Sequence, residues 1–130
     1  GKGVDSTSSS NEALDAAIKI SKDNGIIVAI TGEIDYVTNG SKVYAIHGGN
    51  EMMTKITATG CALTCLIGAA LTSDQDNIVS TANMLGIYSV ASEKASKSSK
   101  GPASLRTELI DTIYNLTTDE VEKNIKIELI

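Results

Sequence analysis

A short apolar run, Ile26-Ile27-Val28-Ala29-Ile30, constrains the fold of this chain more than any other segment. It follows the turn pair Asn24-Gly25 and stops at Thr31-Gly32. A continuous apolar run of this length between turn residues is typical of a strand covered on both faces. An apolar helical stripe over 12–24 precedes it. A helix that leads into a buried strand favours an α/β fold with a largely parallel sheet flanked by helices.

The segment after this strand has the pattern of a β-hairpin. Residues 35–38 and 42–47 are rich in strand-forming side chains, and Asn39-Gly40 between them supplies the positive φ angles of a tight turn. We predict a further short strand over 52–56, then helices near 60–72, 75–97, 102–116 and 118–124, and a closing strand over 126–130. No repeat or internal boundary is found, so residues 1–130 are expected to form part or all of one domain.

The composition narrows the classes of function. The 130 residues carry a net charge of −5, which argues against nucleic acid or an anionic membrane as a partner. The chain has neither Phe nor Trp and only four Tyr, so its core must be aliphatic and it offers no aromatic platform for RNA bases. No apolar run reaches the length of a membrane span.

Cysteine use predicts a reducing compartment. Cys61 and Cys65 are four residues apart, so on a helix they share one face rather than forming a bridge. With His47 as the only His, these thiols do not make a closed zinc site. Because no secretory signal is visible at the start of the chain, we expect a cytoplasmic protein.

The segment Thr57-Ala58-Thr59-Gly60-Cys61 is the leading candidate for a functional site. Small residues run directly into an apolar helical pattern, and a helix start carries unpaired N–H groups that attract anions such as phosphate. Thr59 and Gly60 leave room for a phosphate near the backbone, and Cys61 lies in the first turn, where negative charge on sulfur is favoured. The structural alternative is a helix cap with small packing residues and a Cys that acts as a small apolar side chain.

Two further positions invite a functional interpretation. Thr31-Gly32 follows the apolar strand, and open α/β sheets bind ligands at the carboxyl ends of their strands, although a plain turn also explains the pair. His47 closes a hairpin strand beside Gly48-Gly49, where an exposed or locally bonded side chain is expected. No Asp or Ser at a suitable spacing supports a catalytic triad with His47.

Several segments together resemble the hydroxyethylthiazole kinases, members of the ribokinase-like superfamily. In chain order these segments are Lys2-Gly3-Val4-Asp5-Ser6, Val28-Ala29-Ile30-Thr31-Gly32-Glu33-Ile34-Asp35 with Tyr36-Val37-Thr38 after it, Met53-Thr54-Lys55-Ile56-Thr57, Thr59-Gly60-Cys61-Ala62-Leu63, and Lys100-Gly101-Pro102-Ala103-Ser104 leading into residues 105–116. The order and the gaps match over nearly the whole chain. The resemblance implies a ribokinase-like layered fold with the β-hairpin as an added element.

The resemblance also implies an activity and its residues. It implies transfer of the γ-phosphate of ATP, with Mg²⁺, to the primary hydroxyl of 4-methyl-5-(2-hydroxyethyl)thiazole, a step of thiamine biosynthesis or salvage. Related ribokinase-like enzymes carry an Asp base where the thiazole kinases, and this chain, carry Cys, here Cys61. Thr31, with Gly32, would contact ATP, and Gly60 with Thr59 would form the anion hole. The family usually has Gly in place of Ala58, at a position whose backbone contacts the substrate.

The matching segments correspond to the C-terminal half of such a kinase. The residues implied to close on the thiazole and to hold Mg²⁺ and the ATP phosphates belong to the N-terminal half, so no metal ligand is assigned in this chain. The resemblance implies a homotrimer with the thiazole site between subunits. We therefore expect these 130 residues to be inactive alone.

Other functions fit parts of the same pattern. One is another ribokinase-like small-molecule kinase, or a related ATP-dependent repair enzyme, that carries Cys at the helix start. Another is a non-catalytic nucleotide-binding fragment or scaffolding subunit. A cysteine hydrolase would use Cys61 as nucleophile, but His47 is the only candidate base for it.

Overall fold

The computed structural model describes residues 10–73 and 75–130. Most of the predicted helices and the closing strand are confirmed to within about two residues at each end. The elements in chain order are α1 (Ser10–Asn24), β1 (Val28–Ile30), β2 (Asp35–Thr38), β3 (Val43–Ile46), the 3₁₀ helix η2 (Glu51–Lys55), α2 (Thr59–Ala70), α3 (Asn77–Ser98), α4 (Pro102–Asn115), α5 (Thr118–Asn124) and β4 (Ile127–Leu129).

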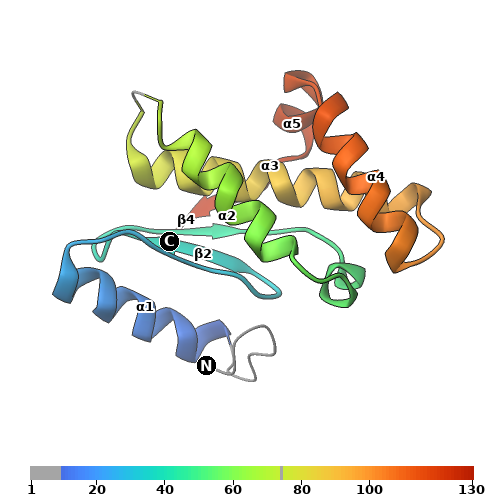
Figure 1. The fold of residues 1–130 in the computed structure, drawn as a ribbon. Helices are drawn as coiled ribbons and strands as arrows, with labels where there is room; N and C mark the ends of the chain where they lie inside the picture. Colours follow the sequence, from blue (N-terminus) through green and yellow to red (C-terminus); the bar gives the residue numbers. More distant parts are fainter. Residues whose placement is uncertain (1–9, 74) are drawn as a thin grey trace.

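The prediction of a largely parallel sheet is wrong. The described strands form one sheet in the order β1-β2-β3-β4, and every neighbouring pair is antiparallel. The connection from β1 to β2 consists only of residues 31–34. A parallel pair needs a crossover of a dozen or more residues, so a link this short can only reverse the chain. The α/β class holds, with helices on both faces of an antiparallel sheet (Figure 1).

The first strand is shorter and less covered than its apolar run predicts. β1 spans only Val28–Ile30, lies at an edge of the sheet, and has Ala29 exposed, so it is not covered on both faces. The hairpin of β2 and β3 is confirmed, with Thr38 opposite Val43. Its loop is wider than a two-residue turn, and Gly40 adopts a φ of 87° in it. The Asn39 side chain accepts hydrogen bonds from the backbone N–H groups of Ser41 and Lys42 at 3.1 and 2.9 Å.

The strand predicted over 52–56 is also wrong. This segment forms the 3₁₀ helix η2, which begins because the Asn50 side chain accepts a hydrogen bond from the Met52 N–H at 2.9 Å. An Asn that caps a helix start competes with strand formation. The turn of η2 leads the chain from the end of β3 to the start of α2.

The core lies between the sheet and α3. α1 packs against β1 and β2 on one face, whereas α3 packs against β2, β3 and β4 on the other, with α2 and α4 against α3 (Figure 1). The apolar core is aliphatic apart from one Tyr, as the composition predicts, and it consists of Val37, Ile46, Leu63, Ile78, Ala82, Leu85, Tyr88, Ala91, Ala95, Leu105 and Leu109. This packing holds α2 at the edge of the core.

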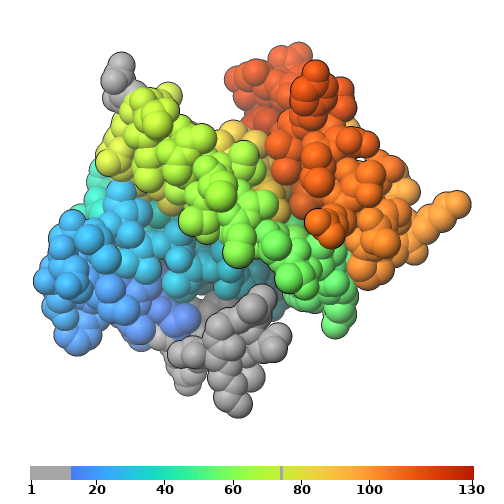
Figure 2. Space-filling model, viewed as in Figure 1, coloured from blue at the N-terminus to red at the C-terminus, as the bar shows by residue number. Residues whose placement is uncertain are grey.

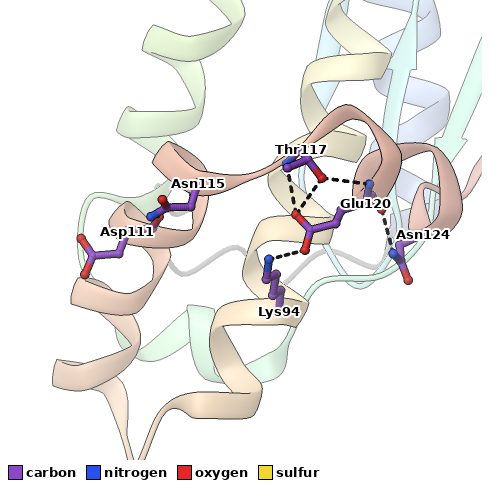
Figure 3. Close-up of polar contacts among 6 residues, drawn as sticks. All are labelled: Lys94, Asp111, Asn115, Thr117, Glu120 and Asn124. Atoms are coloured by element: carbon purple, nitrogen blue, oxygen red, sulfur yellow. Dashed lines mark hydrogen bonds and ion pairs between the residues drawn. The ribbon is translucent and has the colours of Figure 1, made fainter.

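The last helix is held by a small polar network (Figure 3). Thr117 and Glu120 form a capping box at the start of α5, and the Glu120 carboxylate also pairs with the Lys94 ammonium of α3. The hydrogen bond from Lys94, followed by those from the Thr117 backbone and hydroxyl, lowers the pKa of Glu120 to about 2. Within α4, the Asn115 side chain donates to the Asp111 carbonyl at 2.7 Å. Of these contacts, the pair of Glu120 with Lys94 attaches α5 to α3.

Two helical glycines should respond oppositely to the same substitution. A Cβ at Gly86 of α3 would lie 2.6 Å from Cδ1 of Ile125, whereas a Cβ at Gly68 of α2 would meet no described atom within 4 Å. We expect Gly68→Ala to raise the free energy of unfolding by about 1 kcal/mol through helix propensity. Gly86→Ala should instead lower it by about 1 kcal/mol or more, because the Ile125 side chain must move. Urea unfolding of both variants tests this, and equal stabilisation by both would contradict the packing.

Candidate functional site

The candidate residues meet at one end of the sheet. β1 ends there, β2 begins there, and β3 ends there, because Asp35 at the start of β2 is opposite Ile46 at the end of β3. η2 then brings the chain to the start of α2, so the loop after β1 and the start of α2 lie at the same end of the sheet (Figure 1). Thr31-Gly32 and Thr59-Gly60-Cys61 therefore lie at the same end of the sheet.

The start of α2 is left open to an anion. The first intrahelical bond runs from the Ala62 N–H to the Ala58 carbonyl at 3.0 Å, so the N–H groups of Thr59, Gly60 and Cys61 precede the helical ladder. Among the described residues, no side chain caps this end of the helix and no acidic side chain lies in its first turn. Uncapped N–H groups and the helix dipole together favour a phosphate at this position.

Gly60 is not explained by packing within the chain. A Cβ built on Gly60 would meet no described atom within 4 Å. A larger residue would therefore fit against the described residues. A glycine at this position would instead allow a ligand or another segment to approach the backbone closely.

Contacts from α3 fix the position of the α2 start. The Tyr88 hydroxyl of α3 donates to the Thr59 carbonyl at 3.1 Å, and burial raises the pKa of this phenol. Leu63, one turn into α2, is 5% exposed and packs in the core. The helix start is thus held by the protein interior while Gly60 and Cys61 are exposed, and donors held in place in this way are what an anion hole requires.

Both cysteines of α2 lie on its outer side. Cys61 and Cys65 are exposed and unbridged. This agrees with the prediction that they share a face, and it overturns the alternative of a buried, packing Cys61. In the space-filling view, α2 lies on the face of the molecule that is toward the viewer (Figure 2). The Cys61 thiol is therefore exposed at the start of the helix.

The loop after β1 contains a residue that sequence reasoning did not single out. Thr31 and Gly32 are exposed, and the Gly32 N–H donates to Oδ1 of Asp35 at 2.9 Å. Burial raises the pKa of the Asp35 carboxyl to about 6, against the opposing effect of the Gly32 hydrogen bond. The available signal was an Asp at the first position of a strand, three residues after a turn Gly, where Asp commonly accepts a local backbone hydrogen bond.

The remaining candidates have structural explanations. Nε2 of His47 lies 3.6 Å from a carboxylate oxygen of Glu128 on β4, so the local contact predicted for this His is present.

In the part of the chain that the structure describes, no group of three or more His, Cys, Asp and Glu side chains is placed to hold a metal ion. No helix within the described ranges is long and apolar enough to cross a membrane. The quoted segment at residues 2–6 lies outside the described residues.

The residue that precedes α2 adopts a strained conformation. Ala58 has a φ of 72°, in the left-handed region that Gly adopts freely. This conformation costs an L-residue about 1–2 kcal/mol, and the greater freedom of Gly in the unfolded chain returns less than about 1 kcal/mol of that. It also explains physically why a Gly is expected at this position.

Replacing Ala58 by Gly should therefore stabilise the fold. We expect Ala58→Gly to raise the free energy of unfolding by about 1 kcal/mol. The matched control is Ala62→Gly, the same change within α2, which should lower it by about 1 kcal/mol. Urea midpoints of the two variants give the comparison, and a loss of stability in Ala58→Gly would contradict the left-handed geometry.

The fold and the site together define a class of protein. An α/β domain with an uncapped, rigidly held helix start beside an exposed strand-end loop is suited to a phosphate-bearing ligand. The profile of the Hydroxyethylthiazole kinase family matches residues 1–119. The chain therefore belongs to the hydroxyethylthiazole kinase family.

Individual relatives agree with this membership. Hydroxyethylthiazole kinase of Methanocella arvoryzae is 40% identical over 126 residues, which cover 97% of this chain and 47% of that protein. The enzyme of the same name from Zea mays is 43% identical over 129 residues, covering 98% of this chain and 46% of that protein. A solved hydroxyethylthiazole kinase structure from Pyrococcus horikoshii matches with a TM-score of 0.86 and 28% identity, over 92% of this chain and 47% of that one. The chain spans about half the length of these relatives.

Proposed function

We propose that this chain is the C-terminal half of a kinase that phosphorylates 4-methyl-5-(2-hydroxyethyl)thiazole with ATP and Mg²⁺, in thiamine biosynthesis or salvage. The observation that carries the proposal is the α2 start, where uncapped N–H groups, an exposed thiol and a glycine without a packing role coincide. Family membership supplies the substrate class. The wider ribokinase-like alternatives share the anion site but not this membership.

In the proposed reaction Cys61 acts on the substrate hydroxyl. Cys61 in its thiolate form accepts the hydroxyl proton and becomes a thiol, and the hydroxyl oxygen bonds to the γ-phosphorus of ATP. The bond from that phosphorus to the bridging oxygen breaks, and ADP leaves. The N–H groups of Thr59 and Gly60 donate to the phosphoryl oxygens in transit, and the backbone at Ala58 contacts the thiazole.

We propose that this chain contacts ATP but does not supply the ligands of Mg²⁺. The exposed Thr31, with Gly32 beside it, is the proposed nucleotide contact, and the α2 start offers donors for phosphate oxygens. We assign the ligands of Mg²⁺ to an N-terminal half, as the family resemblance implies. Bound there, Mg²⁺ would neutralise charge on the ATP phosphates.

We further propose that an N-terminal half and other subunits complete the protein. The apolar side chains of Tyr114 and Ile110 on α4 are 89% and 62% exposed, and α2 buries only Leu63. Apolar surface of this extent is expected to be covered by another part of an assembled protein. We propose that the assembly is a homotrimer in the cytoplasm, where the thiols of Cys61 and Cys65 stay reduced.

An ADP-release assay tests the function. The complete kinase, meaning this chain together with its N-terminal half, is given Mg-ATP with the thiazole alcohol, with hydroxymethylpyrimidine, or with a sugar. We expect ADP release that depends on the thiazole alcohol, and none from the 130-residue chain alone. Turnover with another acceptor would indicate a different ribokinase-like kinase. ATP binding with no turnover would indicate a non-catalytic role.

A further inference from the structure

We infer that Asp35 is a positioning residue that holds the loop carrying Thr31 in place for the nucleotide. This inference rests on the proposed function, because it assigns the loop to ATP. It concerns a residue that does not itself contact the reacting atoms. The side chain of Asp35 acts on Thr31 through the backbone of Gly32.

The geometry places Asp35 between the sheet and the loop. As the first residue of β2 it is in register with Ile46 of β3, so its backbone is fixed by the sheet. Its side chain reaches back across the four-residue connection 31–34 and accepts the Gly32 N–H at 2.9 Å. The loop is thereby tied to the strand immediately after Thr31. A backbone held in this way presents the Thr31 side chain in a defined direction at the end of the sheet where α2 begins.

The environment of Asp35 is unfavourable for a group that serves only as a turn former. The carboxyl is half-buried, and among the described residues it forms no ion pair. Burial without a cation is costly for a carboxylate, and its raised pKa reflects this cost. Stability alone would favour Asn, which offers the same acceptor oxygen without charge. The geometry and this cost together point to a residue retained for the nucleotide loop.

The bond to Gly32 also divides the loop into two roles. Because the Gly32 N–H is directed at Asp35, this N–H is engaged within the chain, and Thr31 is the exposed group that remains for the nucleotide. Gly32 then contributes by its backbone conformation and by its bond to Asp35. Glu33, the other acidic residue of the loop, is exposed and serves as a matched control.

The test compares Asp35→Ala, Asp35→Asn and Glu33→Ala in the complete kinase. We expect Asp35→Ala to raise the KM for Mg-ATP about tenfold, the loss expected for one charge-assisted hydrogen bond, with kcat changed less than about threefold. Asp35→Asn should restore the KM, and Glu33→Ala should leave it unchanged. In ¹⁵N-labelled protein, the Gly32 amide should lose its protection from exchange in Asp35→Ala and keep it in Asp35→Asn.

The outcomes distinguish a failure of the inference about Asp35 from a failure of the proposed function. An unchanged KM in Asp35→Ala, or an equal rise in Asp35→Asn, would overturn the inference while leaving the kinase activity in place. Absence of thiazole-dependent turnover in the unmodified protein would instead overturn the proposed function. If Asp35→Ala fails to fold, Asp35→Val, which suits a strand and also lacks the acceptor oxygen, replaces it in the same comparison.

Discussion

Replacing Cys61 by Ala in the complete kinase should lower kcat by about 100-fold or more, because the substitution removes the proposed proton acceptor for the substrate hydroxyl. The dissociation constant for ATP should change little, since the N–H donors of Thr59 and Gly60 and the loop at Thr31 are untouched. Single-turnover rates give the chemical step, and equilibrium binding of an ATP analogue gives the affinity.

Cys65→Ala is the matched control for this prediction. Cys65 lies one turn further along α2, is also exposed, and undergoes the same chemical change. We expect near-normal kcat from it. Cys61→Asp should retain part of the activity, because a carboxylate at the same helix start can also accept the hydroxyl proton. Equal losses of kcat and ATP affinity in Cys61→Ala would argue that Cys61 has only a structural role.

Asp35→Asn should stabilise the 130-residue chain by as much as about 3 kcal/mol near pH 7.5. Burial raises the pKa of Asp35 from 3.8 to about 6, so the folded state holds this proton more tightly than the unfolded state. The stability contributed by the protonated carboxyl is fully present below about pH 3.8 and is lost as pH rises through about 6. Asn carries no charge at any pH and avoids this loss.

The difference in unfolding free energy between the variant and the parent, measured in urea at several pH values, isolates this group from the other carboxylates. It should be near zero at about pH 4, rise through pH 5 to 6, and level off above about pH 7. Glu33→Gln, the same chemical change at an exposed site in the same loop, should give a small difference that is nearly flat with pH. A flat difference for Asp35→Asn would contradict the burial of its carboxyl.

Several helices were predictable from sequence because they carry their own start signals. Gly101-Pro102 opens α4, and the Thr117–Glu120 capping box opens α5. These signals act over a few residues, so they survive whatever the rest of the fold does. The hairpin was predictable for the same reason, through Asn39-Gly40 and the strand-forming side chains on either side of it.

The direction of the strands was not predictable from the apolar run at 26–30. Such a run indicates a buried strand, but it contains no information about the direction of the neighbouring strand. The informative feature was the length of the next connection, since residues 31–34 cannot hold a crossover. The prediction of a strand over 52–56 was also wrong. The Asn50 cap favours a helix start more strongly than the apolar residues after it favour a strand.

For the candidate site, the sequence pointed to the α2 start and the Thr31-Gly32 loop. It did not predict the backbone geometry and hydrogen bonds that support a functional role for them. The left-handed Ala58, the Tyr88 bond to Thr59 and the Asp35 bond to Gly32 depend on where tertiary packing places the backbone. Local residue patterns do not contain that information. The assignments of Cys61, Gly60, Thr59 and Thr31 to catalysis and ATP remain predictions that experiments on the complete kinase must test.

The most direct test is to identify the product by mass spectrometry after the complete kinase has been incubated with Mg-ATP and 4-methyl-5-(2-hydroxyethyl)thiazole. We predict a thiazole alcohol heavier by one phosphoryl group, formed in step with ADP and lost in Cys61→Ala. Formation of ADP without phosphorylated thiazole, or unmodified thiazole alongside intact ATP, would contradict the assignment of this chain to a thiazole-phosphorylating enzyme.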